Sequence, residues 1–511
     1  MNINLSLLSL VLLCASTMQF SQAQHKKNTN FELELHGGYT SNGVVPFWMR
    51  SNQYGSVPLD GGSGSFVIRA NKTYRQPGEW QGRKTDTESL WDWGYGLEAR
   101  ANVGKDVNVQ LIDAHAKVRY AMFEVKAGRS KDVMGLNGDT LLSSGNFAVS
   151  GNALGVPKLD ISIPEYYRLP WFGGLFSFKG NFANGYMGKY EINPDEFLIK
   201  SDNQLHTLLH QKSVYGRLGK PHWKLTLYGG FNHQAQWGSE KKAYGSAYEL
   251  NTFQTLWHVA SGKAYGNESN GIPRSKIGNH QGSLDIGGSY NFGSVNVLVY
   301  RQNFYDVGAL SKLANIKDGL NGITLTNNLY KSSDRVWDWQ KLLVEFFYSK
   351  DQAGYPWSKS TKSGDEDYYN NFFYVEGWSY KNKNIGNPLI AAKNTVREGQ
   401  IAYHNEFFIS NRVVASHVGL SGHIQRWDFL TKLTYAMHYG TFSTSEYGGS
   451  LGQTRFPPIY GIFKKVNQFS AIVQGERLIS KRLFIGGTVA LDQGKLLENS
   501  LGMSVRLHKT F

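Results

Sequence analysis

Aromatic side chains that could bind a ligand gather in neighbouring segments of the second half of the chain. The segment RVWDWQ contains Trp337 and Trp339, the segment DEDYYNN contains Tyr368 and Tyr369, and Trp357 lies between the two. Such rings stack on flat or apolar faces, including those of sugar rings, while polar side chains beside them hold hydroxyl and carboxylate groups. The pattern favours a carbohydrate-binding surface in external loops. The alternative is packing of the same rings within a loop or at a membrane interface.

Motifs of common enzyme, metal and cofactor sites are missing from the sequence. It contains no HExxH, no paired CxxC and no Gly-Lys-Ser phosphate loop. The acidic run from Asp365 to Asp367 could contact Ca²⁺, but without a full ligand set a solvated loop is the better interpretation. We therefore expect no enzymatic activity, no cofactor and no metal. A lipid hydrolase whose Ser and His meet only in the folded chain is the less favoured alternative.

Alternating hydrophobicity predicts that strands position these residues. In WKLTLYGGF, Trp223, Leu225 and Leu227 alternate with polar residues, and DFLTKLTYAMHY shows the same period of two. The chain is also rich in strand and turn formers, with 14% aromatic residues and 57 glycines. Counting weaker segments, we expect roughly 16 to 18 strands, a number typical of single-chain outer-membrane barrels.

The last strand, LGMSVRLHKTF, indicates why the strands form a barrel. Its apolar residues Leu501, Met503 and Val505 share one side, and the chain ends on Phe511. A closed barrel leaves no free strand edge, and a terminal aromatic residue is typical of the assembly signal of bacterial outer-membrane proteins. The predicted fold is an all-β transmembrane outer-membrane β-barrel of antiparallel strands, with short helical segments in loops or at the barrel mouth. A soluble all-β fold has the same period and is the alternative.

The connections between strands are of two sizes. Short connections at Gly288–Ser294 and Leu491–Ser500 suit the periplasmic side of a barrel. The long connections Ala235–Asn279, Tyr305–Trp339 and Asp351–Asn371 suit the external side. The stretch ELNTFQTLWHVASG, inside the first long connection, predicts a local helix.

The N-terminal segment resembles a secretory signal peptide. Leu5–Ala15 is apolar, and Ser21, Gln22 and Ala23 form a small-x-Ala cleavage site. We expect residues 1–23 to be the signal peptide and residues 24–511 to form a single barrel domain. The only cysteine, Cys14, lies within the leader, with lipid attachment at Cys14 as the alternative.

A basic charge balance suggests an acidic partner. The net charge is +14 and the isoelectric point is near 9.4, so the barrel could attract uronic-acid polymers or lipopolysaccharide phosphates. Alternatively, the cations pair with the 40 acidic residues. Nucleic acid is not an expected partner, because the basic residues are dispersed. Basic residues on the predicted lumen faces are Lys117, Arg119, Lys126, Lys224, Lys432 and Arg506.

Several stretches, taken together and in order, resemble the Wzi family of capsule-assembly outer-membrane proteins. The resemblance extends from about Phe31 to Phe511. It implies a monomeric barrel of about eighteen strands, assembled by the barrel assembly machinery among outer-membrane lipids, that holds capsular or other surface polysaccharide as a lectin. A diffusion porin or a structural subunit of another envelope machine is the alternative. The stretches are VPFWMRSNQYG, LLSSGNFAVSGNALGVP, GGFNHQAQWGS, GNHQGSLDIG, DGLNGI, YYNNFFYVEGWSYKNKNIGNPL and NRVVASHVGLSG.

These stretches add further candidate residues. Arg412 and His417 join the aromatic residues as candidate polysaccharide contacts. We expect a second group of residues to form a hydrogen-bonded network in the lumen that supports the barrel. The same network is the alternative role for Arg412 and His417. The second group comprises His233, Trp237, Asn279, His280 and Asp285.

Overall fold

The computed structural model describes most of the chain after the predicted leader. The described residues are 28–75, 78–80, 89–193, 204–306, 308–331, 335–353, 366–400, 406–445 and 462–511. The predicted signal peptide, Trp357 and Asp365 lie outside these ranges.

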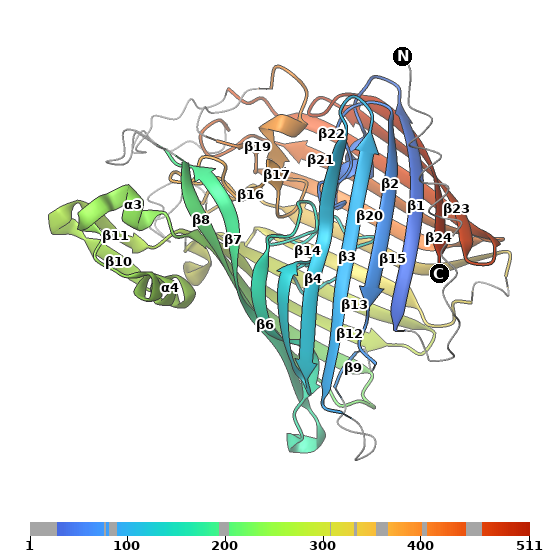
Figure 1. Cartoon of the computed structure of the whole chain (residues 1–511), viewed down its shortest axis with the longest axis horizontal. Coiled ribbons are helices and arrows are strands. Elements are labelled where there is room, and N and C mark those ends of the chain that lie inside the picture. The colour runs from blue at the N-terminus through green and yellow to red at the C-terminus, as the bar shows by residue number, and fades with distance from the viewer. Residues whose placement is uncertain are drawn as a thin grey trace.

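Eighteen of the strands in the described residues form one antiparallel sheet that closes into a barrel (Figure 1). Closure is made by the last strand pairing with the first, from Thr510 opposite Glu32 to Gly502 opposite Thr40. The barrel fold and the upper end of the expected strand number are thus confirmed. The strands are β1 (Thr29–Thr40), β2 (Ser63–Lys72), β3 (Trp91–Val103), β4 (Asn108–Tyr120), β5 (Phe123–Arg129), β6 (Lys158–Arg168), β7 (Phe176–Glu191), β8 (Gln204–Leu218), β9 (Leu225–Trp237), β12 (Asn279–Asn291), β13 (Val295–Tyr305), β14 (Gly319–Asn327), β15 (Trp337–Tyr348), β20 (Val413–Ile424), β21 (Trp427–His438), β22 (Val466–Ser480), β23 (Leu483–Gly494) and β24 (Ser500–Thr510).

The outer surface of the barrel is apolar because alternate residues of each strand face outward. On β24, Met503 and Val505 are 49% and 61% exposed, whereas the intervening Ser504 is buried. On β12, Leu284 and Ile286 are exposed while Asp285 is buried. An apolar exterior on a closed antiparallel barrel is the arrangement that satisfies every backbone group within lipid. The chain is accordingly an outer-membrane barrel of a bacterial envelope.

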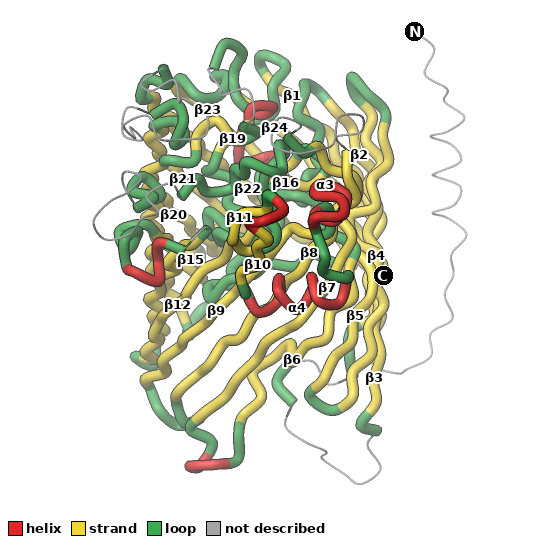
Figure 2. Tube along the Cα trace, turned by 90° about the vertical axis from the view of Figure 1, so that its left-hand side faces the viewer, coloured by secondary structure: helices red, strands yellow, loops and turns green. Residues whose placement is uncertain are grey.

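Helices are short and confined to connections, as expected. They are α2 (Phe47–Arg50), α3 (Glu240–Tyr244) and α4 (Thr252–Ser261). The last two, with the hairpin of β10 (Ala264–Asn267) and β11 (Ile272–Lys276), project from the barrel on the left of Figure 1 and face the viewer in Figure 2. Among the described residues, no helix is long and apolar enough to cross a membrane.

The two ends of the barrel differ in the length of their connections. Tight turns at 121–122, 292–294, 425–426 and 481–482 share one end with Phe511, which we call the periplasmic end because short turns of such barrels face the periplasm. The connections 130–157, 238–278 and 349–412 lie at the other, external end.

One missed strand overturns part of the sequence-based assignment of sides. The segment predicted as the long connection Tyr305–Trp339 contains β14, whose alternation is weak because Leu320 faces inward and its outward apolar residues are few. β14 returns the chain to the periplasmic end before β15 begins, and the connection after β15 lies at the external end, as predicted for Asp351–Asn371. The connection 495–499, which was predicted to be periplasmic, lies at the external end as well.

The barrel lumen contains a hydrophobic core of its own. Residues 130–157, 366–400 and 406–412, which we call the plug, fold between the walls and include β16 (Ser379–Tyr380), β17 (Lys383–Asn384), β18 (Ala391–Ala392) and β19 (Phe408–Ser410). Trp378 is fully buried and donates from Nε1 to the Ala148 carbonyl at 3.1 Å. Phe147 stacks on Phe304 of β13 with ring centroids 4.2 Å apart.

Polar contacts join the plug to walls on opposite sides of the lumen. Because the wall side chains that face inward are largely polar, they replace the water that would otherwise hydrate the plug backbone. The plug therefore occupies the cross-section of the lumen near the external end. Its contacts include Gln236 Nε2 of β9 with the Gly377 carbonyl (2.9 Å), the Leu136 N–H with Asp285 of β12 (2.8 Å), the Ser144 N–H with Glu345 of β15 (2.7 Å), His417 Nε2 of β20 with the Leu142 carbonyl (2.6 Å), and Arg129 of β5 with the Tyr380 hydroxyl (3.2 Å).

The position of Phe511 leads to a test of the assembly signal. Its ring lies outside the barrel at the periplasmic end, 5.4 Å from that of Phe31, and its N–H donates to the Phe31 carbonyl. Deleting Phe511 should lower the outer-membrane level severalfold, whereas Thr510→Ala, on the lumen side, should not. Immunoblots of outer-membrane fractions, with heat-modifiable gel mobility as the test of barrel closure, would measure this. Equal levels of both variants would contradict the assignment.

Candidate functional site

Trp337 and Trp339 do not lie in an external loop, and that expectation is wrong. They begin β15 at the periplasmic end, where Trp337 pairs with Ile424 and is 53% exposed. The physical reason is β14, which brings the chain back to the periplasmic side before RVWDWQ. Both rings have the position of a membrane-interface girdle.

Tyr368 and Tyr369 are fully buried in the plug. Tyr368 donates to Asp318 at 2.8 Å and accepts from Asn315 Nδ2 at 2.9 Å, while the Tyr369 hydroxyl donates to the Phe147 carbonyl. No surface of either ring is open to a polysaccharide. Both residues therefore pack within the core of a connection, which was the alternative interpretation of these rings.

Arg412 and His417 also lie within the protein. Arg412 is 1% exposed and donates from Nη1 to the Lys350 carbonyl at 2.8 Å. His417 is held between the Leu142 carbonyl and Thr434 Oγ1. Their geometry is that of bonds between plug and wall.

The residues expected in a lumen network line adjacent strands. On β9 and β12, His233 Nε2 lies 2.8 Å from His280 Nδ1, and Asn279 donates to Gln236 at 2.8 Å. Asp285 accepts from the Leu136 N–H and from Ser283, and Trp237 is buried at the external end of β9. The structure thus brings these residues onto one wall beside the plug.

The described acidic residues of the DEDYYNN segment bind backbone and amide groups. Glu366 accepts hydrogen bonds from the N–H groups of Asp306, Gly308 and Ala309, and Asp367 accepts from Asn411. Their oxygens are thereby engaged in closing the connection 306–318. Within the described ranges, no group of three or more His, Cys, Asp or Glu side chains could hold a metal ion.

Many lumen cations are paired, as the second interpretation of the charge balance expected. Lys126 lies 2.7 Å and Lys158 2.9 Å from Asp132, while Arg506 lies 2.7 Å from Glu476. These pairs line the periplasmic half of the lumen, where a pocket of about 650 Å³ contains the Asp132 cluster. The net positive charge is therefore only partly available to a partner.

The surface best placed to bind a large external ligand is a cleft between the projecting connection 238–278 and the plug. It has an open volume of about 1190 Å³. Arg274 and Lys276 are exposed at its rim, and Phe372, from the plug, is 54% exposed. We call this the external cleft; the residues that carry its chemistry are Tyr244, Tyr265, Arg274, Lys276 and Phe372, above the carboxyl groups of Glu240 and Asp306.

Electrostatically, the external cleft favours anions. Burial raises the pKa of Glu240 to about 7. Burial, reinforced by the carboxylates of Glu366 and Asp367, also raises the pKa of Asp306 well above its ordinary value. The carboxyl groups at the floor of the cleft thus carry less negative charge near pH 7 than exposed carboxyl groups would, so the cations Arg274 and Lys276 dominate the charge of the cleft.

Helix α4, on the same projecting connection, presents two exposed rings that are not part of the lining of the external cleft. Asn251 accepts from the Gln254 N–H at 2.9 Å, and the Gln254 side chain accepts from the Asn251 N–H, which forms a capping box. Phe253 and Trp257 are four residues apart and therefore share one face, where they are 76% and 62% exposed. Sequence reasoning predicted this helix but did not single out its rings; their spacing within a predicted helix was the available signal.

Comparison with known proteins finds similar solved structures only at low sequence identity. No family model and no curated protein matches the chain. Similar solved structures include Acinetobacter baumannii OccAB2, with 12% identity over 95% of this chain and 98% of that chain and a TM-score of 0.43. Pseudomonas aeruginosa OccK2 (OpdF), solved in complex with glucuronate, is 10% identical over 94% of this chain and 96% of that chain, also with a TM-score of 0.43. At these values the similarity concerns the fold alone.

The raised pKa of Glu240 makes the base of the projecting connection sensitive to pH. A carboxyl group whose pKa rises from 4.5 to about 7 on folding stabilises the folded state fully below pH 4.5 and loses that contribution as the pH rises through 7. Glu240→Gln should therefore raise the hydrogen-exchange protection of amides 240–244 at pH 8 by roughly tenfold to a hundredfold. At pH 4.5 it should have little effect. Glu268→Gln, an exposed change on the same connection, is the matched control; equal protection in all three proteins at pH 8 would contradict the assignment.

Proposed function

We propose that this chain is a plugged outer-membrane barrel that holds an acidic surface polysaccharide at the external cleft, without catalysing a reaction. The observation that carries the proposal is the plug, which bonds to opposite walls and leaves the external cleft as the large open surface among the described residues. This function agrees with the resemblance to the Wzi family and with a role as a monomeric lectin in capsule attachment.

The chemistry of the external cleft suits a uronic-acid polymer. Arg274 and Lys276 can pair with carboxylates, and the rings of Tyr265 and Phe372 offer apolar faces for sugars. Long polymers need an open cleft and not an enclosed pocket, because the chain must continue in both directions. The candidate contacts thus move from Trp337, Trp339, Tyr368 and Tyr369 to the connection 238–278 and the edge of the plug.

A diffusion porin is the second candidate. The observation that favours it is the charged wall of the periplasmic half, with alternating cations and carboxylates around Asp132. Such a wall resembles the polar interior of water-filled barrels. In that case the plug would have to leave a path for solutes between it and the wall.

Glycan retention distinguishes the lectin from the alternatives. Deleting the gene should leave polymer synthesis intact but shift surface glycan from the cell pellet into the medium. In a plate assay, Phe372→Ala should weaken glycan binding by the purified protein about fivefold to tenfold at every salt concentration, since about 1 to 1.4 kcal/mol of stacking is lost. Arg274→Ala should weaken binding at low salt and have less effect above 0.1 M, where charges are screened over about 10 Å. Phe292→Ala, similarly exposed but periplasmic, is the matched control.

Conductance in planar bilayers tests the plug directly. The native protein should conduct poorly. Gly386→Val should open it, because a Cβ at residue 386 would lie 2.1 Å from the Tyr369 hydroxyl oxygen and 2.3 Å from the Phe147 carbonyl oxygen. Gly229→Val, with open space around residue 229 on β9, should leave conductance unchanged. Steady conductance by the native protein, with normal glycan retention in the deletion strain, would establish the porin.

A further inference from the structure

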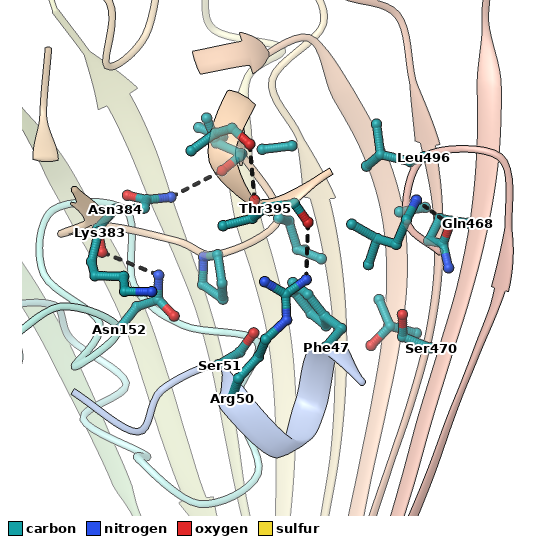
Figure 3. Close-up of a pocket in the computed structure, with 18 of the residues that line it drawn as sticks. Phe47, Arg50, Ser51, Asn152, Lys383, Asn384, Thr395, Gln468, Ser470 and Leu496 are labelled. Atoms are coloured by element: carbon teal, nitrogen blue, oxygen red, sulfur yellow. Dashed lines mark hydrogen bonds between the residues drawn. The ribbon is translucent and has the colours of Figure 1, made fainter. Parts of the chain in front are cut away.

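A second pocket, inside the barrel and separate from the external cleft, carries two cations on an apolar lining. Its cavity volume is about 60 Å³. Figure 3 shows Arg50 and Phe47 side by side on α2, with Lys383 of the plug on one side of them and Leu496 on the other. The rest of the lining is mainly apolar, including Leu389, Ile390 and Leu497. The pocket is thus a hydrophobic chamber with positive charge on two sides.

Both cations are half-buried, and neither forms an ion pair with a described carboxylate. Arg50 Nη2 donates to the Thr395 carbonyl at 3.0 Å, but its Nε is buried without an acceptor among the described residues. The nearby carboxylate of Asp492 accepts from the Phe47 N–H and from Ser470 instead. Lys383 makes no ion pair with any described carboxylate, although Asp60 lies near enough to act on it through space. Unpaired charge in an apolar chamber is costly unless an anion neutralises it.

The polar side chains around the two cations hold the pocket in shape. Asn152 donates to the Asn384 carbonyl, and Gln468 accepts from the Leu497 N–H, so both bond within the protein (Figure 3). Lys383 is held in place because its aliphatic chain packs over Gly55, where an added Cβ would lie 3.0 Å from Lys383 Cγ. Gly55 has a φ of +61°, so glycine is favoured there by backbone geometry as well.

We propose that this inner pocket binds an amphiphilic anion, a carboxylate or phosphate attached to a short single apolar chain. The charged group would lie between Arg50 and Lys383, and the chain would pack against Phe47, Leu389 and Leu496. Because the barrel wall separates the pocket from the bilayer, and the connections that line it are external, the ligand enters from the external aqueous side. A two-chain membrane lipid does not meet these conditions.

The charge state of Lys383 gives the inner pocket a pH dependence. Burial, reinforced by the Arg50 guanidinium, lowers the pKa of Lys383 to about 8, against the opposing effect of Asp60. Anion affinity should therefore fall between pH 7 and pH 9 as the Lys383 amine loses its proton. Lys383→Arg should keep the affinity and remove the pH dependence, because guanidinium stays protonated in this range.

Calorimetry on the full chain in a neutral maltoside detergent tests the proposal. The probes are acetate, butyrate, hexanoate and the uncharged hexanamide. Affinity should rise about threefold to fourfold for each added methylene group, and hexanoate should bind at least tenfold more tightly than hexanamide. Lys383→Met, which keeps the aliphatic chain, should lower hexanoate affinity at least tenfold. Lys381→Met, an exposed change on the same hairpin, should leave it unchanged and also accounts for partition into micelles.

Clear results would overturn the proposal. Equal binding of hexanoate and hexanamide, equal affinity of the native and Lys383→Met proteins, or no measurable binding by the native protein would each do so. Heat-modifiable mobility of every variant on denaturing gels shows that the barrel remains closed, so that lost binding is not mistaken for lost folding. Because the external cleft shares none of the residues changed here, glycan retention should be unaffected by Lys383→Met.

Discussion

The whole structure depends on the satisfaction of backbone hydrogen bonds where no water is available. A strand in hydrocarbon has no partner for its N–H and C=O groups except another strand, so the sheet must close. Here the last strand meets the first over a nine-residue register, and Phe511 follows directly on that pairing. The outward side chains of Met503 and Val505 then face lipid, while the side chains at the alternate positions of each strand face the lumen and can bond to the segments inside it.

Those alternate positions are used for attachment of the plug. Asp285, Glu345 and His417 bond to backbone groups of residues 136–144, and the apolar centre around Trp378 and Phe147 is packed as in a soluble protein. The plug is therefore held by polar bonds at its periphery and by hydrophobic burial at its centre. With the lumen occupied, the two sites that we propose for ligands are the external cleft and the pocket around Arg50 and Lys383.

The sequence predicted the barrel well because its governing signal is local. Period-two alternation, the terminal strand and the helix at 252–261 each follow from short-range pattern. The position of Trp337 was predicted wrongly because strand β14 was missed. Leu320 of β14 faces inward and interrupts the alternation of apolar and polar residues. The burial of Tyr368 and Arg412 could not be foreseen, because a plug is made by contacts between segments hundreds of residues apart. The external cleft likewise contains both Arg274 and Phe372, and the sequence around neither residue predicts that the two lie near each other.

The plug and the barrel are stabilised against different solvents. The barrel is stabilised because its sheet pairs the backbone groups that would otherwise be unpaired in lipid. The plug is stabilised by burial of side chains away from water, the interaction that urea weakens. The two parts are joined mainly through side chains, with the backbone pairing of the wall continuous around them. We therefore expect unfolding in two stages. The interior would loosen first, within a wall that still resists detergent, and a cell could lose the binding surfaces of this protein while its outer membrane remained sealed by an intact sheet.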